Sequence, residues 1–289
     1  MLGAIIGDVV GSKYEFYNIK TTDFPLISKG CTYTDDTVMT VAVARALLYA
    51  QDHRTDFKEV LINEMHKLGR QYPSAGYGGM FSSWIKSERP VPYNSFGNGS
   101  AMRVSPCGMI AVELSEALSL AKASAEVTHN HPEGIKGAQA VAGAIFLAKT
   151  KATKEDIRQF IIESFYELDF SIDDIRPKYY FNETCQGSVP QAIACFLESE
   201  NFEDAIRNAV SLGGDSDTIA AIAGSIAWEY YIEDGIFTPM NHPEFCDSVR
   251  DLLPDEFNKT INKFTCECVS RYDAYQRIGI CPLIPHENK

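Results

Sequence analysis

Apolar residues recur every three to four positions along most of this chain, which is the spacing of one face of an α-helix. The pattern predicts helices over residues 2–12, 37–50, 56–69, 79–86, 115–127, 132–148, 153–166, 188–199, 201–211, 218–231, 242–253 and 257–275. Strand-like alternation is nearly absent, and the short run Val91–Tyr93 carries a proline, which disfavours a strand. The sequence therefore predicts an all-α fold.

Local signals support these helices and their organisation. Thr153 and Asp156 have the spacing of a capping box at a helix N-terminus. No linker-like composition interrupts the chain, and no internal repeat is visible, so we expect a single domain over residues 1–289. The loop-rich stretches are 87–100, 128–134, 169–187 and 211–217. The third contains Tyr179–Phe181, which we expect to pack on the core rather than to cover a ligand.

The charge and the apolar pattern exclude several partners. The chain has 39 Asp and Glu against 26 Lys and Arg, a formal charge of −13, and no basic run. Nucleic-acid binding needs Lys and Arg to displace counterions, so no nucleic-acid partner is expected. No apolar run reaches the roughly 20 residues of a membrane-spanning helix, and no basic leader precedes the first apolar residues. The 8 cysteines are scattered without a CxxC pair, and we expect reduced thiols in a cytoplasmic protein.

Two short acidic clusters stand at the start of apolar helices rich in small residues. They are Thr34–Thr37 (TDDT) and Asp215–Thr218 (DSDT), the second behind Gly213–Gly214. One Asp would be enough to cap a helix, whereas two adjacent carboxylates raise one another's pKa unless a cation lies between them. Mg²⁺ and Mn²⁺ prefer carboxylate, hydroxyl and water oxygens. If the two N-termini face each other, the clusters predict a metal-dependent enzyme.

Two loops and one glutamate are weaker candidates on their own. The glycines on both sides of Asn98 permit positive φ and close backbone approach, and consecutive amides can bind an anion, although the segment taken alone is more typical of a plain tight turn. His129 and His131 have a zinc-ligand spacing, but no third ligand is near them in sequence. Glu15 follows the first predicted helix and, without further context, is typical of a surface residue.

Together, and in this order along the chain, these segments resemble the motifs of the ADP-ribosylglycohydrolase family. The resemblance rests on Gly7-Asp8-x-x-Gly11 through Glu15, on 34–37, on 97–103, on Thr128-His129 with Pro132, and on 213–218. It extends to about residue 229. It implies an all-helical orthogonal bundle with two Mg²⁺ or Mn²⁺ ions in a central cleft. It also implies hydrolysis of an ADP-ribosylated protein side chain at C1″ of the distal ribose, with release of ADP-ribose.

The resemblance further implies roles for individual residues. The metal ligands would be Thr34, Asp35, Asp36, Asp215, Asp217 and Thr218. Glu15 would lie beside the metals as a mobile gate or a general acid/base. The residues near the diphosphate and ribose would be Asn98, Gly99, Ser100 and Met102, with His129 also near the ligand. Either Glu15 or Asp36 could activate the water, and the sequence does not decide between them.

Other interpretations stay open. The chain could be a two-metal hydrolase of another ADP-ribose or nucleotide derivative, or a non-catalytic relative that binds ADP-ribose. Helical phosphohydrolases usually use His-Asp pairs as metal ligands, and no His-Asp dipeptide occurs here. The presence of every implied metal ligand weighs against a non-catalytic relative. The acceptor, whether arginine, serine or another group, is not determined by the sequence.

Overall fold

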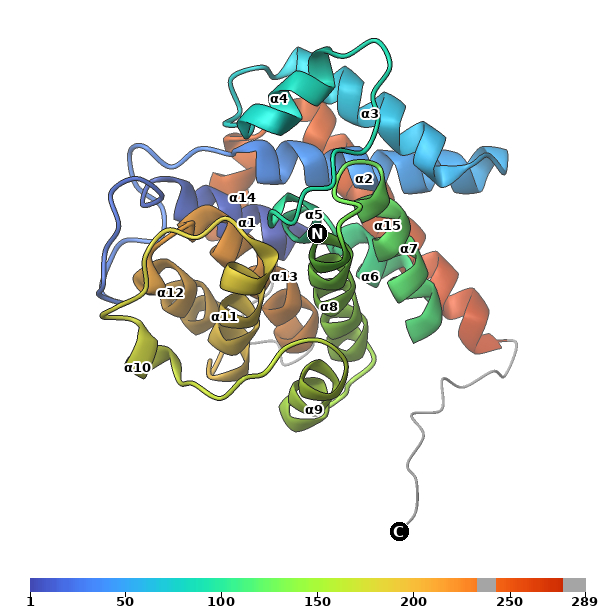
Figure 1. The fold of residues 1–289 in the computed structure, drawn as a ribbon. Helices are drawn as coiled ribbons and strands as arrows, with labels where there is room; N and C mark the ends of the chain where they lie inside the picture. The colour runs from blue at the N-terminus through green and yellow to red at the C-terminus, as the bar shows by residue number, and fades with distance from the viewer. Residues whose placement is uncertain (233–242, 278–289) are drawn as a thin grey trace.

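A computed structural model describes residues 1–232 and 243–277, and this part of the chain consists of helices joined by loops (Figure 1). The helices are α1 (Leu2–Ser12), α2 (Asp35–His53), α3 (Phe57–Gln71), α4 (Gly79–Lys86), α5 (Gly99–Met102), α6 (Ser105–Ile110), α7 (Leu114–Glu126), α8 (Pro132–Lys149), α9 (Lys154–Ser164), α10 (Ile172–Ile175), α11 (Cys185–Leu197), α12 (Phe202–Leu212), α13 (Ser216–Tyr231), α14 (Pro243–Asp251) and α15 (Asp255–Arg277). Within the described ranges, an isolated bridge between Gly97 and Thr184 is the extent of β-type pairing. The predicted all-α class is confirmed.

Each predicted helix has a counterpart whose ends differ by a few residues, and the capping box of Thr153 and Asp156 is formed. The predicted start at residue 242 lies outside the described residues. The short helices α5, α6 and α10 were not predicted, because four to six residues are too few to show a helical period. Helix α11 begins at Cys185 rather than Ser188, and it continues through Pro190.

Helices α1 and α13 cross in direct backbone contact. Gly3, Gly7 and Gly11 recur every four residues and therefore lie on one face of α1. A Cβ on Gly7 would lie 2.0 Å from the carbonyl oxygen of Ala220, and a Cβ on Gly11 would lie 2.4 Å from that of Ser216. No side chain fits between the two backbones, so these positions require glycine.

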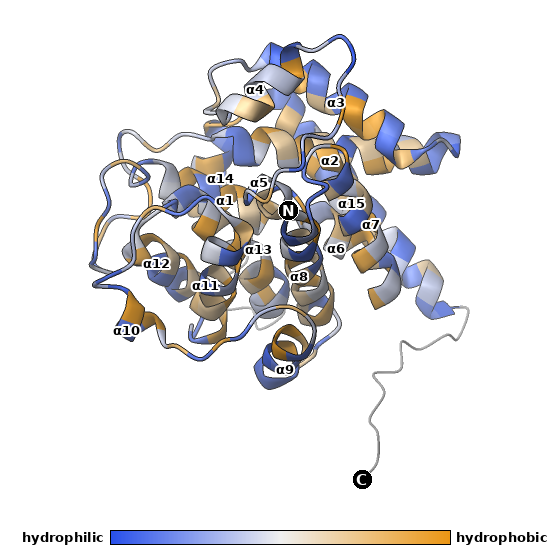
Figure 2. Cartoon of the chain, viewed as in Figure 1, coloured by the Kyte–Doolittle hydropathy of each residue, from blue (hydrophilic) through white to orange (hydrophobic). Residues whose placement is uncertain are grey.

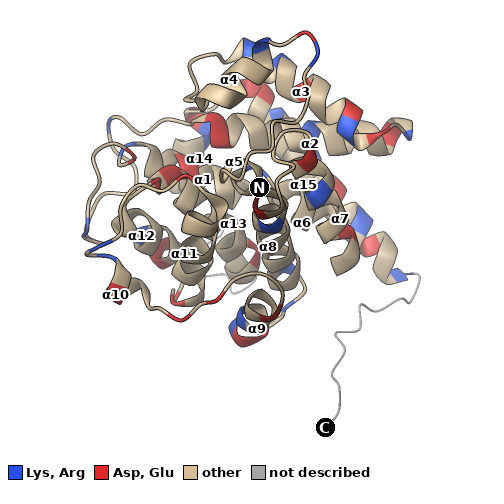
Figure 3. Ribbon diagram, viewed as in Figure 1, with Lys and Arg blue, Asp and Glu red and all other residues tan. Residues whose placement is uncertain are grey.

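The other helices surround this pair. Helices α8, α11 and α12 pack against α13, and α2 contacts both α1 and α13. In Figure 3, α3, α7 and α9 carry charged residues of both signs, and Figure 2 shows hydrophilic and hydrophobic residues side by side on α7 and α9. One hydrophobic cluster includes residues from α1 to α15. None of the described helices has the length and apolar composition needed to cross a membrane.

The α1–α13 crossing gives a stability prediction. Gly7→Ala should lower the free energy of unfolding by about 1–3 kcal/mol or more, because the added methyl group overpacks a backbone contact. Helix propensity alone would change stability in the opposite direction, by about 1 kcal/mol in favour of alanine. Gly79→Ala in α4 is the matched control, since a Cβ there meets nothing within 4 Å. Urea denaturation of both variants checks this, and equal stabilities would contradict the packing argument.

Candidate functional site

The N-termini of α2 and α13 face each other, as the metal-site hypothesis requires. Asp35 and Asp36 form the first turn of α2, while Asp215 is the N-cap of α13 and Asp217 lies in its first turn. Three of these carboxylates therefore lie inside the helices rather than directly before them. The hydroxyl of Thr218 donates to Oδ1 of Asp36 across the gap, at 3.3 Å.

A tight turn brings Asp215 to this cluster. Gly213 and Gly214 both have φ of +74°, in the region that favours glycine. The side chain of Asn18 holds the turn, because it accepts from the Gly214 N–H at 2.7 Å and donates to the Gly214 carbonyl at 3.0 Å. Nδ2 of Asn98 then donates to Oδ2 of Asp215 at 2.7 Å, which links the glycine-rich loop to the acidic cluster.

Glu15 belongs to the same cluster and is not an isolated surface residue. Carboxylate oxygens of Glu15, Asp215 and Asp217 lie within 4.8 Å of one another. Glu15 is half-buried, whereas the two aspartates are buried. Burial and the charges of Asp215 and Asp8 raise the pKa of Glu15 to about 7. At that pKa a carboxyl group can hold or release a proton near neutrality.

The remaining carboxylates are also hard to ionise. Burial, followed by the charges of Asp8, Asp215 and Glu15, raises the pKa of Asp35 to about 8. Burial also raises the pKa of Asp36 and Asp217 well above the ordinary range, with the neighbouring carboxylates as the second cause. Full ionisation of this group therefore needs a compensating positive charge.

Two buried oxygens show where such a charge would bind. Oδ2 of Asp36 and Oδ1 of Asp217 are buried and have no hydrogen-bond partner among the described residues. An unpaired buried carboxylate oxygen is costly, and it is also the ligand that a hard divalent cation prefers. The residues of the acidic cluster are thus able to bind a metal ion. A surface hollow of about 450 Å³ between α2, α3 and α15 and another of about 510 Å³ beside α3 include none of these carboxylates.

Asp8 was overlooked as a site residue in the sequence. It is fully buried in α1, and burial raises its pKa to about 6 despite the hydrogen bonds it accepts. Its carboxylate accepts from the Thr34 N–H at 3.0 Å, from the Thr34 hydroxyl at 2.7 Å, and from the Thr37 N–H at 3.1 Å and the Thr37 hydroxyl. These bonds attach the start of α2 to α1. A lone acid in an otherwise apolar helix was the available signal.

The hydroxyl of Thr34 already has two functions. It accepts from the Asp36 N–H at 3.2 Å as the N-cap of α2, and it donates to Asp8. A hydroxyl oxygen has two lone pairs, so one remains for a cation. Metal ligation by Thr34 stays a prediction, and it would add to the capping role rather than replace it.

The glycine-rich loop is anchored to the segment before α11. The Cys185 N–H donates to the Phe96 carbonyl at 2.9 Å, and the Asn98 N–H donates to the Glu183 carbonyl at 2.8 Å. Gly97 and Gly99 do not have positive φ, so the expectation that these positions need glycine for a left-handed backbone conformation is wrong. Gly99 is instead limited by space, because a Cβ there would lie 3.1 Å from Nε2 of His129.

The loop residues present backbone rather than side-chain groups. Gly99 and Ser100 open α5, and N–H groups in a first helical turn have no partner within the helix, which suits anion binding. The Ser100 hydroxyl is already engaged within the protein, since it donates to the Gly134 carbonyl at 2.7 Å. Met102 is buried in the hydrophobic core. Any contact of these residues with a ligand would therefore use the main chain.

The two histidines of the 128–132 segment have different surroundings. His129 is buried, its ring centroid lies 5.7 Å from that of Tyr93, and its Nδ1 lies 2.7 Å from Oγ1 of Thr128. Burial and the charge of Arg103 hold its pKa well below the usual range, so the imidazole is neutral. His131 instead caps α8, where its Nδ1 accepts from the Glu133 N–H at 3.1 Å.

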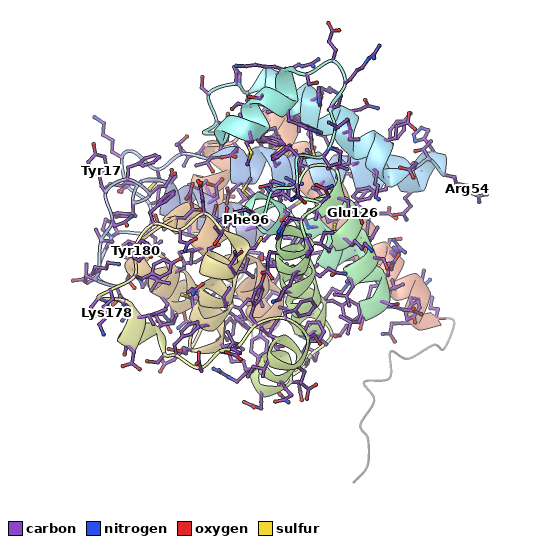
Figure 4. The ribbon with its side chains drawn as sticks, viewed as in Figure 1. Tyr17, Arg54, Phe96, Glu126, Lys178 and Tyr180 are labelled. Carbon is purple, nitrogen blue, oxygen red and sulfur yellow. The ribbon has the colours of Figure 1, made fainter. Side chains whose placement is uncertain are left out.

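Several aromatic residues belong to the loops that lead to the acidic cluster or pack against it. Tyr179 packs against Gly214, and its hydroxyl donates to the Gly187 carbonyl at 2.6 Å. Tyr180 is 75% exposed and Phe181 is 44% exposed, so the expectation of core packing is confirmed for Tyr179 alone. Figure 4 shows Tyr17, two residues after Glu15, and Tyr180 projecting outward on the same side of the molecule.

Comparisons with known proteins agree with this arrangement. ADP-ribosylhydrolase ARH3 of Homo sapiens is 26% identical, over 91% of this chain and 93% of its own length. ADP-ribosylarginine hydrolase Tri1 of Pseudomonas putida is also 26% identical, over 82% of this chain and 70% of its own length. A solved ADP-ribosylglycohydrolase-related protein complex has the same fold, with a TM-score of 0.65 at 21% identity, over 94% of this chain and 96% of its own. Because residues 1–234 match the ADP-ribosylglycohydrolase family profile, the chain belongs to that family.

Proposed function

We propose that this chain is a metal-dependent enzyme that hydrolyses ADP-ribose from a modified protein side chain. The observation that carries the proposal is the meeting of the α2 and α13 N-termini, with unpaired buried oxygens on Asp36 and Asp217. Family membership supports hydrolysis of an ADP-ribosyl bond. The names of the relatives support an ADP-ribosylated substrate, and one of them specifies arginine as the acceptor.

The proposed metal ligands are those that the family resemblance implies. They are Thr34, Asp35, Asp36, Asp215, Asp217 and Thr218, for two Mg²⁺ or Mn²⁺ ions. Such ions, when bound, would orient the ribose hydroxyls and lower the pKa of an attached water. We also propose one domain over residues 1–289, which the continuous hydrophobic cluster from α1 to α15 supports.

Glu15 is the stronger of the two candidates for the general acid/base. Cleavage breaks the bond between C1″ and the side-chain nitrogen or oxygen, and positive charge develops on the sugar, as in glycoside cleavage generally. A proton must leave the attacking water and reach the leaving group. The half-buried carboxyl of Glu15 lies beside Asp215 and Asp217 and can exchange protons with solvent. Asp36 is buried and already accepts from Thr218.

The binding part of the proposal concerns the diphosphate and the ribose. This acidic protein has no basic patch in its sequence, so an anion site made of backbone amides suits it. The amides of Gly99 and Ser100 and the imidazole of His129 lie together beside the acidic cluster, to which Asn98 is hydrogen-bonded. We therefore place the diphosphate and the adjoining ribose on the glycine-rich loop.

Chelation tests the metal requirement. Proteins carrying arginine-linked and serine-linked ADP-ribose are incubated in parallel with the enzyme, and the release of free ADP-ribose is measured. EDTA should abolish release, and added Mg²⁺ or Mn²⁺ should restore it, because the carboxylates need a cation to be ionised together. Undiminished release in excess EDTA would exclude the metal-dependent mechanism. Metal-dependent ADP-ribose binding without release from either substrate would favour a non-catalytic relative.

Substitution of a proposed metal ligand should lower the hydrolysis rate but should not lower the stability of the metal-free protein. Asp217→Asn, like Asp35→Asn, should lower the rate by at least roughly a hundred-fold, because even the loss of a residue that only orients a metal ligand costs about 10–100-fold. A carboxyl whose pKa is higher in the folded than in the unfolded protein destabilises the fold above its unfolded pKa. Removing it should therefore keep or raise the melting temperature of the metal-free protein at neutral pH, and should reduce the further rise that Mg²⁺ produces.

Calorimetry with and without Mg²⁺ measures both effects. The control is Asp23→Asn, which removes the same charge from an exposed carboxylate away from the acidic cluster. Normal turnover together with a normal response to Mg²⁺ in Asp217→Asn would leave only a helix-capping role for the cluster.

Glu15 and Asp36 can be separated by their effect on metal binding. Glu15→Gln should lower the hydrolysis rate by about 10²–10⁴-fold, the usual contribution of a general acid/base. Binding of the product ADP-ribose in the presence of Mg²⁺ should change much less, because the proposed ligands and the glycine-rich loop remain. Asp36→Asn should weaken Mg²⁺ binding as well. Titration calorimetry with each ligand distinguishes these cases, and wild-type hydrolysis by Glu15→Gln would assign proton transfer to another group.

A further inference from the structure

Arg103 is a buried cation with neutral partners. It follows α5 and is only 1% exposed. Its Nη2 donates to the Ser124 carbonyl and to Oγ1 of Thr128, each at 2.9 Å. Ser124 lies in the last turn of α7, where unpaired carbonyls carry partial negative charge. The C-terminus of α7 therefore compensates the guanidinium, and burial lowers the pKa of Arg103 only to about 10, so it stays charged at neutral pH.

A chain of hydrogen bonds leads from Arg103 to His129. The Thr128 hydroxyl accepts from Arg103 and lies 2.7 Å from Nδ1 of His129. Two proton arrangements satisfy this contact. In one, the hydroxyl donates to a bare Nδ1, and the imidazole proton is on Nε2. In the other, Nδ1–H donates to the hydroxyl, whose own proton must then reach another acceptor, such as the phenol oxygen of Tyr93.

The charge of Arg103 selects between these arrangements. The guanidinium lies on the Nδ1 side of the imidazole, because both groups contact the same hydroxyl oxygen. A lone pair directed toward a nearby cation is stabilised, whereas an N–H dipole with its positive end toward that cation is destabilised, and burial strengthens both effects. Protonation of both nitrogens is opposed by the same charge. The bare Nδ1 with Nε2–H is therefore favoured.

The second nitrogen of His129 faces the glycine-rich loop. A Cβ on Gly99 would lie 3.1 Å from Nε2, and one on Gly97 would lie 3.7 Å from it. The first-turn amides of α5 begin at the same place. A proton on Nε2 thus adds a side-chain donor to a group of backbone donors, whereas the other tautomer would present a lone pair that repels an anionic oxygen.

We propose that Arg103 and Thr128 are positioning residues that hold His129 as the neutral Nε2–H tautomer, so that it donates a hydrogen bond to an oxygen of the bound ADP-ribose. The identity of the ligand rests on the proposed function. The tautomer itself does not, because it can be measured in the ligand-free protein.

Nitrogen NMR of the imidazole rings tests the tautomer directly. The protein contains 6 histidines, and the signals of His129 are those lost in His129→Gln. In the wild-type protein at neutral pH, Nε2 should show the shift of a protonated imidazole nitrogen and Nδ1 that of a bare one. A protonated Nδ1 with a bare Nε2 would overturn the proposal, whatever the protein hydrolyses.

Variants of Thr128 test the positioning role. Thr128→Val keeps the shape of the side chain but removes the hydroxyl, so the His129 tautomers should mix and ADP-ribose should bind up to about tenfold more weakly, the effect of one hydrogen bond. Thr128→Ser keeps the hydroxyl and should retain both the tautomer and the affinity. An unchanged tautomer and affinity in a folded Thr128→Val variant would refute the role of Thr128. If that variant does not fold, the nitrogen NMR spectrum of the wild-type protein still decides which tautomer His129 adopts.

The two proposals can fail separately. The Nε2–H tautomer in a protein that does not bind ADP-ribose would remove the ligand assignment and leave the Arg103–Thr128–His129 arrangement intact. ADP-ribose binding by a protein whose His129 is protonated on Nδ1 would refute the proposed tautomer and leave the proposed function intact.

Discussion

The backbone contact between α1 and α13 positions most of the candidate site. Because Gly7 and Gly11 allow these helices to touch, the end of α1 lies against the start of α13; a Cβ on Gly11 would be 2.6 Å from Cα of Asp217. Asp8 in turn binds Thr34 at the N-terminus of α2. One close crossing therefore places the starts of two other helices, which are far apart in sequence, beside each other.

Asp8, Asp36 and Asp217 are all buried, but they differ in how many hydrogen-bond donors contact their carboxylates. Asp8 accepts four hydrogen bonds from Thr34 and Thr37, so its oxygens are satisfied within the fold. Asp36 and Asp217 each keep a buried oxygen without a partner among the described residues. The number of donors, rather than burial or charge, separates the structural acid from those available to a cation.

Much of the fold could be predicted from the sequence because long amphipathic helices have a strong period, and the all-α class followed from it. The short helices α5, α6 and α10 could not, since they have no period of their own. The acidic clusters were visible as local excesses of charge, but the contact between Thr218 and Asp36 depends on packing between helices. The roles of Asp8 and Arg103 were missed for the same reason: each acts through partners distant in sequence. The binuclear arrangement and the individual ligand roles stay predictions.

The thiol of Cys185 lies behind the glycine-rich loop, where its Sγ donates to the Gly97 carbonyl at 3.1 Å. It is fully buried, and burial raises its pKa to about 12, so the native protein offers alkylating reagents neither access nor a thiolate. Cys266 on α15 is exposed and would react without any change of conformation. Alkylation of Cys185 would then require the loop and α11 to separate. The rate of Cys185 alkylation relative to that of Cys266 would therefore report how often the glycine-rich loop opens locally.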